Sequence, residues 1–136
     1  MDVTAKYQLL YEHIYHSKGV KTVCVTTCLN YFGVPMDAYS YTSSHKNREV
    51  FIDVLRRFGY SVRSRNSQFK VKKCQTMTDL RAMLRKSEYT NSTMFIVSGY
   101  QSKKAHLMVL NGNGETIIDT AKGLRWNIRS INIVEK

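Results

Sequence analysis

The chain has 136 residues, 43% of them hydrophobic and 23% charged, a composition that is ordinary for a soluble globular protein and excludes long disordered tails. Its 21 lysines and arginines stand against 10 acidic residues, and the formal charge of +11 favours an acidic partner such as nucleic acid or an anionic protein surface. A basic surface that is simply solvated is an equally good interpretation, because net charge does not locate a patch. We expect one domain over residues 1–136.

The cysteine count and the apolar runs bear on the compartment. Three cysteines, an odd number, argue against a disulfide framework. The N-terminal residues lack the charged-then-apolar pattern of a signal peptide, and no apolar run approaches the length of a membrane span. We therefore expect no membrane partner and a reducing cytoplasm, which would be the host cytoplasm if the protein is phage-encoded.

The expected elements, in chain order, are helices first and strands later. Apolar spacing predicts helices over residues 4–16, 24–32, 47–58 and 78–87, with a short helical turn at 36–42. Thr4, Asn47 and Thr78 are the expected N-caps, and Gly33 and Gly59 the expected C-terminal stops. Strands are expected over residues 60–63, 93–97, 105–110, 115–119 and 126–134, with an extended piece around 69–71 and turns at 99–104 and 111–114. This order predicts an α+β fold in which the helices pack on one side of an antiparallel meander.

Cys24 stands at the start of the second expected helix. A helix N-terminus presents unpaired N–H groups and a partial positive charge, both of which favour a thiolate. The same N–H groups can hold an oxyanion during acyl transfer. Most free cysteines are instead small buried hydrophobic residues, and Cys28, one turn further along, is interpreted as such. Cys74 lies in a basic loop with no base near it in the sequence.

His106 opens an otherwise apolar strand, and Asp119 follows thirteen residues later, across a tight Asn-Gly turn. Adjacent strands joined by such a turn bring the two side chains to the same end of the sheet. An acid there orients the imidazole and stabilises its charged form. Asn111 is the rival orienting residue, but it lies at the tip of the hairpin. Cys24, His106 and Asp119 are therefore the predicted catalytic residues.

A metal site is the alternative use of the same region. His13, His16, Cys24 and Cys28 offer two imidazoles and two thiols, which zinc accepts, but zinc ligand pairs usually lie on turns with closer cysteine spacing. His13 and His16 also fit the last turn of the first expected helix, where partly positive side chains suit the helix dipole. We expect no metal and no cofactor.

The order of these motifs resembles a known family. A Cys opens a helix that ends in Gly33-Val34-Pro35, a capped helix precedes an apolar strand, and Ala105–Val109 and Ile117–Thr120 flank an Asn-Gly turn. This is similar to the small papain-like cysteine peptidase fold of bacterial and phage papain-like proteins and, more distantly, of the peptidase domains of bacteriocin exporters. The resemblance covers roughly residues 17–123.

The resemblance implies that Cys24 is the nucleophile, His106 the general base and Asp119 the orienting acid. Such families also place a Gln or Asn a few residues before the nucleophile, where its amide donates to the oxyanion. Residues 17–23 of this chain contain neither. Lys18 or Thr22, together with the backbone N–H of Cys24, is the expected substitute.

Two classes of function follow. The first is a cysteine hydrolase, acting on a peptide, isopeptide or related amide through an acyl-enzyme, with an acidic substrate favoured by the net charge. The second is an inactive papain-like binding protein, such as a phage effector that grips a host protein or nucleic acid. The net charge and the missing Gln or Asn favour the second, and basic residues interleaved with aromatics over residues 58–69 are compatible with phosphate contacts.

Overall fold

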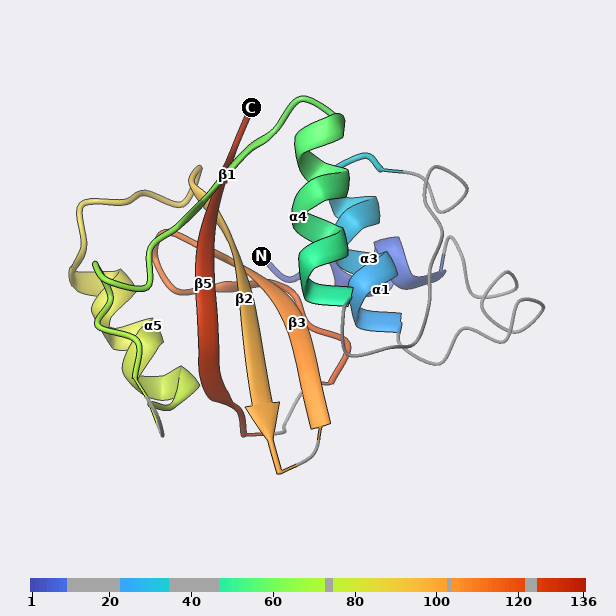
Figure 1. Cartoon of the computed structure of the whole chain (residues 1–136). Coiled ribbons are helices and arrows are strands. Elements are labelled where there is room, and N and C mark those ends of the chain that lie inside the picture. Colours follow the sequence, from blue (N-terminus) through green and yellow to red (C-terminus); the bar gives the residue numbers. More distant parts are fainter. Residues whose placement is uncertain (10–22, 35–46, 73–74, 103, 122–124) are drawn as a thin grey trace.

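The computed structural model describes residues 1–9, 23–34, 47–72, 75–102, 104–121 and 125–136. Its helices are α1 (Thr4–Leu9), α3 (Val23–Tyr31), α4 (Asn47–Arg57) and α5 (Met77–Lys86). Its strands are β1 (Ser61–Ser64), β2 (Met94–Gln101), β3 (Lys104–Asn111), β4 (Thr116–Ile118) and β5 (Asn127–Glu135). The protein is therefore mixed α+β, as predicted (Figure 1). No helix within the described ranges is both long and apolar enough to cross a membrane.

The five strands form one antiparallel sheet in the order β1-β5-β2-β3-β4. The part from β2 to β4 is the expected meander. The prediction of a simple meander is wrong for the last strand, because β5 does not lie beside β4 but returns to the middle of the sheet, between β1 and β2. Partner choice over such sequence distances depends on packing, which local patterns do not encode.

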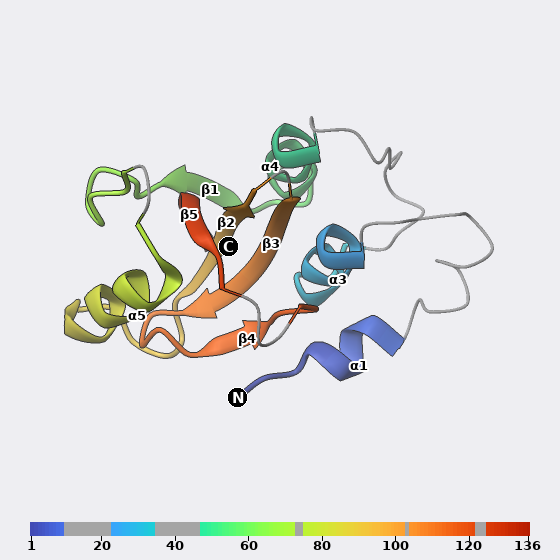
Figure 2. The same ribbon diagram turned by 90° about the horizontal axis from the view of Figure 1, so that it is seen from below.

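Helices cover both faces of the sheet, and the expectation that they lie on one side is wrong. Ile96 and Val109 point to a core shared with α3 and α4, whereas Phe95, Val97 and Met108 point to a second core shared with α5. Figure 2 shows α5 on one side of the sheet and α1, α3 and α4 on the other. The apolar runs of β2 and β3 are continuous rather than alternating because both faces of these strands are buried.

Two glycines end helices as expected. Gly33 after α3 has φ +82° and Gly59 after α4 has φ +90°, conformations that an L side chain rarely adopts. The N–H of Val34 donates to Leu29 (3.0 Å), and the N–H of Tyr60 donates to Leu55 (3.1 Å), so each reversed turn satisfies a carbonyl of the last helical turn. Both helix ends are confirmed.

All three N-caps differ from the prediction. Helix α5 begins at Met77 and is capped by Thr76, not by Thr78, because a carboxylate three residues on allows Thr76 to form a capping box. Helix α1 begins at Thr4 itself, and its first N–H donates to Asp2 Oδ1 (2.9 Å). Helix α4 likewise begins at Asn47.

The strand boundaries also differ. β2 runs on to Gln101 and β3 begins at Lys104, so the expected turn at 99–104 is wrong for residues 99–101 and 104, while Ser102 has φ +54°. Residues 69–71 are not extended, since Lys70 has φ +51° and the segment is a turn. The expected helical residues 10–16 and the expected turn at 36–42 lie outside the described residues.

Candidate functional site

Cys24 is the second residue of α3, whose first turn carries no acidic side chain. The helix packs against β3, where the Cys28 thiol donates to the carbonyl of Leu107 at 3.6 Å. Cys28 is completely buried, and this burial raises the pKa of its thiol well above the ordinary value. Cys24 is 5% exposed. The helix therefore holds one inert, buried thiol and one thiol at its N-terminal end.

His106 and Asp119 form a buried ion pair. His106 is the third residue of β3, and Asp119 directly follows β4, its antiparallel neighbour. The imidazole Nε2 and the carboxylate Oδ1 are 2.7 Å apart, and the side chains are 4% and 12% exposed. This distance suits a charge-assisted hydrogen bond in a dry environment. The strand pairing thus brings together the two residues that the hairpin predicted.

The Asp119 backbone and carboxylate are fixed by further hydrogen bonds. Its Oδ1 also accepts the N–H of Ala121 (2.9 Å), and its own N–H donates to Oγ1 of Thr4 (2.8 Å). The Thr4 hydroxyl in turn donates to Asp2 Oδ1 at 2.6 Å. The N-terminal residues therefore hold the backbone of Asp119, a connection that no sequence pattern indicated.

The pKa values of the pair move apart. Burial alone lowers the pKa of His106, but the hydrogen bond to Asp119 and the interaction with Cys24 outweigh it and raise this pKa to about 9. Burial alone raises the pKa of Asp119, but the hydrogen bond from His106 and the backbone N–H of Ala121 bring it below its usual range. At neutral pH the pair is therefore an imidazolium and a carboxylate.

Cys24 is the second neighbour of the His106 imidazole, and its interaction with the ring also raises the His106 pKa. Because Nε2 of the ring faces Asp119, Nδ1 is the nitrogen left for the thiol. The structure thus brings Cys24, His106 and Asp119 into one chain of contacts, which runs from the N-terminus of α3 through β3 to the end of β4. A thiol, an imidazole and a carboxylate in this order can generate a thiolate–imidazolium pair.

Trp126 is a site neighbour that the sequence reasoning missed. Its indole stacks on the His106 ring, with centroids 4.7 Å apart and planes 19° from parallel. The close approach needs Gly99, since a Cβ there would stand 3.0 Å from the Trp126 Cβ and 3.2 Å from the carbonyl oxygen of Asn127. A glycine inside a strand pattern is a signal for such an approach. In the sequence it was interpreted as a turn.

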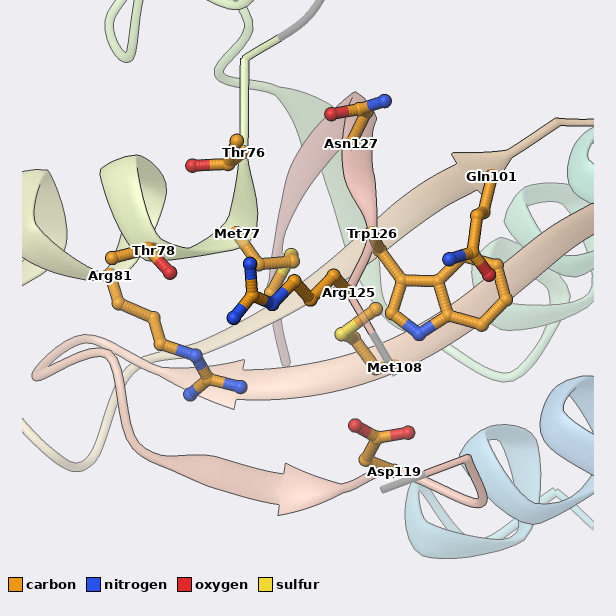
Figure 3. A pocket seen from close by; sticks show the side chains of 10 residues that line it. All are labelled: Thr76, Met77, Thr78, Arg81, Gln101, Met108, Asp119, Arg125, Trp126 and Asn127. Carbon is orange, nitrogen blue, oxygen red and sulfur yellow. The ribbon is translucent and has the colours of Figure 1, made fainter. Parts of the chain in front are cut away.

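A pocket with a volume of about 660 Å³ adjoins the ion pair (Figure 3). Asp119 and Trp126 belong to its wall, together with Met77, Arg81, Met108 and Arg125. Cys24 and His106 do not line it. In Figure 3 the Asp119 carboxylate lies below Met108, and the indole nitrogen of Trp126 is turned toward the same region. The pocket therefore reaches the candidate site from the Asp119 and Trp126 side.

Several predicted residues lie outside the described residues: Lys18 and Thr22, the expected oxyanion donors, and Cys74, His13 and His16. The zinc alternative therefore retains only Cys24 and Cys28 in the described part of the chain. Within that part, no three His, Cys, Asp or Glu side chains are arranged to hold a metal ion.

Comparison with known proteins finds no match among protein-family models, curated proteins or solved structures. The papain-like resemblance therefore remains a prediction that rests on the motifs quoted for it and on the arrangement of the three side chains.

Proposed function

We propose that the protein is a papain-like cysteine hydrolase that cleaves an amide bond in a peptide, an isopeptide or a related compound. The observation that carries the proposal is the 2.7 Å bond of the buried His106–Asp119 pair, together with Cys24 as a neighbour that raises the pKa of the same imidazole. A buried imidazole with a raised pKa is a feature of acid–base sites.

In the proposed reaction the Cys24 sulfur attacks the carbonyl carbon, and the π electrons of the carbonyl move to its oxygen. The His106 imidazolium donates its proton to the leaving amine as the C–N bond breaks and the acyl-enzyme forms. A water molecule then attacks the thioester, giving its proton to His106, and the sulfur leaves as thiolate. Asp119 keeps its charge throughout and stabilises the imidazolium.

The oxyanion of both tetrahedral intermediates needs N–H donors. We assign this role to the backbone N–H of Cys24, at the positive end of α3, together with Thr22 or Lys18. The first turn of α3 has no acidic residue to compete with the oxyanion for this position.

The alternative is a papain-like binding protein without catalysis, which grips a host protein or nucleic acid. It is favoured by one observation, the 5% exposure of Cys24, because a nucleophile must be reachable by its substrate. The two functions differ in whether the thiol reacts, and this can be measured directly.

The test is alkylation of the protein by iodoacetamide between pH 5 and 9, with each cysteine quantified by mass spectrometry. We expect Cys24 to react at pH 6 at least about tenfold faster than Cys28, because His106 can take the proton of the Cys24 thiol, whereas Cys28 is completely buried. His106→Ala removes this advantage. The matched variant Cys28→Ala lies one turn along the same helix and leaves the rate at Cys24 within about twofold.

Hydrolysis supplies the second arm of the test. A fluorogenic peptide-amide library is screened with wild type, Cys24→Ala and Cys28→Ala. Activity that is lost in Cys24→Ala and kept in Cys28→Ala supports the hydrolase. Activity that persists in Cys24→Ala, or a Cys24 that reacts no faster than Cys28 at pH 6, overturns it in favour of the binding protein.

A further inference from the structure

The pocket beside Asp119 has a surplus of positive charge. Arg81 and Arg125 line it, and Asp119 is its one acidic wall residue within the described part of the chain. The Asp119 charge is matched by the His106 imidazolium at 2.7 Å. The two ion pairs found among the described residues, His106–Asp119 and Arg63–Glu135, include neither pocket arginine. Asp119 also attracts Arg81, so the wall carries two guanidinium groups against one carboxylate, and an excess of positive charge remains for a ligand.

The two arginines reach the pocket from different elements. In Figure 3 Arg81 extends from α5 and Arg125 from the segment before β5, with their guanidinium groups turned toward each other across the pocket. Arg81 is held in place, because Nη1 donates to the Gly114 carbonyl (2.7 Å) and Nη2 to Thr116 Oγ1 (2.8 Å). These two bonds use only part of the five N–H donors of a guanidinium, so donors remain for a ligand.

The other walls suit an acidic amino-acid side chain. Met77, Met108 and Trp126 supply apolar surface, against which methylene groups can pack. The Trp126 indole Nε1 is buried and has no hydrogen-bond partner among the described residues, which leaves a polar donor beside the pocket. A volume of about 660 Å³ is in the range of pockets that hold small ligands. Planar, forked donors match a carboxylate in geometry as well as in charge.

We propose that Arg81 and Arg125 bind a carboxylate group in this pocket, so that the substrate carries an acidic residue or a terminal carboxylate next to the bond that is cleaved. The role in substrate choice rests on the proposed hydrolase function. Carboxylate binding itself does not, and it can be measured without any chemistry at Cys24.

Trp126 provides the reporter, because it is the one tryptophan of the chain and lines the pocket. The indole N–H resonance of the full chain is followed by NMR during titration with N-acetyl-aspartate amide, N-acetyl-asparagine amide, N-acetylglycine and inorganic phosphate. We expect the aspartate amide to bind at least about tenfold more tightly than the asparagine amide, since only the former forms charge-assisted bonds. If N-acetylglycine binds more tightly than the aspartate amide, the pocket binds a terminal carboxylate instead of an acidic side chain.

Variants locate the effect. Arg125 is exposed, so Arg125→Gln is expected to fold and to reduce the aspartate preference to about twofold or less. Arg125→Lys keeps the charge and retains part of the preference. Arg85→Gln is the matched control, because it removes an exposed charge from the same helix as Arg81 at a position outside the pocket wall, and it leaves the preference intact.

Equal binding of the aspartate and asparagine amides, tighter binding of phosphate than of either carboxylate, or an equal loss in Arg85→Gln overturns the proposal. The two proposals fail separately. A carboxylate that binds to a protein whose Cys24 is unreactive supports the pocket and contradicts the hydrolase. A reactive Cys24 in a protein without carboxylate preference supports the hydrolase and contradicts the carboxylate pocket.

Discussion

Helices α3 and α5 begin on opposite faces of the same sheet, and their first turns are built differently. At α5, Thr76 Oγ1 accepts the N–H of Asp79 (3.2 Å), and Asp79 Oδ2 accepts the N–H of Thr76 (3.3 Å). The N-terminus of α5 is thus occupied by its own side chains. The first turn of α3 has no acidic residue and carries Cys24. One helix start is closed by a capping box, and the other presents a thiol.

The closed helix start still serves the candidate site. The N–H of Met77 donates to the carbonyl of Trp126 (3.0 Å), and the N–H of Ile128 donates to Gln75 (2.7 Å). These bonds fix the beginning of β5 and with it the indole that covers His106. A helix N-terminus can therefore contribute to a site in two ways. The start of α3 presents a reactive thiol, and the start of α5 positions Trp126, which covers His106.

Asp119→Asn should have the largest effect, because it removes the negative charge that stabilises the His106 imidazolium beside Cys24. We expect the rate of Cys24 alkylation at pH 6 to fall at least about tenfold, since the imidazolium loses its stabilising partner. The free energy of unfolding should fall by roughly 3 kcal/mol, the usual cost of breaking a buried pair. Alkylation kinetics and urea denaturation measure the two effects.

Glu135→Gln is the matched control for that substitution. Its pair with Arg63 is of similar length, 3.1 Å, but the side chains are 48% and 61% exposed. Water screens such a pair, so we expect a change within about 0.5 kcal/mol and no change at Cys24. Equal losses in the two variants would mean that the His106–Asp119 pair has no special weight.

The pH dependence of stability should show the same pair. The folded pKa of His106, about 9, lies above its ordinary value of 6.5, so its contribution is complete below about pH 6.5 and is lost as pH rises through 9. The pKa of Asp119 is lowered, so its contribution is present above its ordinary 3.8 and is lost as pH falls. The stability difference between wild type and Asp119→Asn should therefore be largest near pH 5 and smaller by about 2 kcal/mol at pH 10. A difference that is constant over this range would contradict the charged pair.

The three side chains that the structure brings together could be singled out from the sequence because each signal is local. Cys24 opens an apolar helix that ends at Gly33, and His106 and Asp119 flank a turn that fixes the distance between their strands. A helix start and a hairpin turn of this kind are set by nearby residues, so the sequence alone predicts them. The contact between Cys24 and His106, by contrast, depends on how α3 packs against β3, which only the structure provides.

Features that depend on distant partners were missed. Gly99 predicts a turn when taken alone, but β2 continues through it, paired with β3 and β5, and a Cβ there would crowd Trp126. The place of β5 in the middle of the sheet and the bond from Asp119 to Thr4, 115 residues apart, have no local signature either. Thr76 was missed for another reason, since two threonines compete for the cap and only one has an acid three residues later.

Thr4→Val should have a moderate effect and tests the hydrogen bond by which Thr4 holds the backbone of Asp119. Valine keeps the shape of the buried side chain but cannot accept the N–H of Asp119. An unsatisfied buried N–H costs about 1–3 kcal/mol, and we expect a loss of stability in that range. The His106 resonance should titrate at a lower pH, because Asp119 is held less firmly. Loss of stability without any change in the His106 titration would show that Thr4 supports the fold but not the pair.

Thr76→Ala should have the smallest effect and tests the capping box at the start of α5. Loss of the cap should lower the free energy of unfolding by about 1 kcal/mol, since one N–H of the first turn of α5 loses its acceptor. Thr78→Ala is the control, because Thr78 is exposed, follows the helix start and is the cap that the sequence pattern favoured. We expect it to change stability by less than about 0.5 kcal/mol. If Thr78→Ala lost more stability than Thr76→Ala, the helix would begin two residues later, away from Trp126. The capping box would then have no link to the indole over His106.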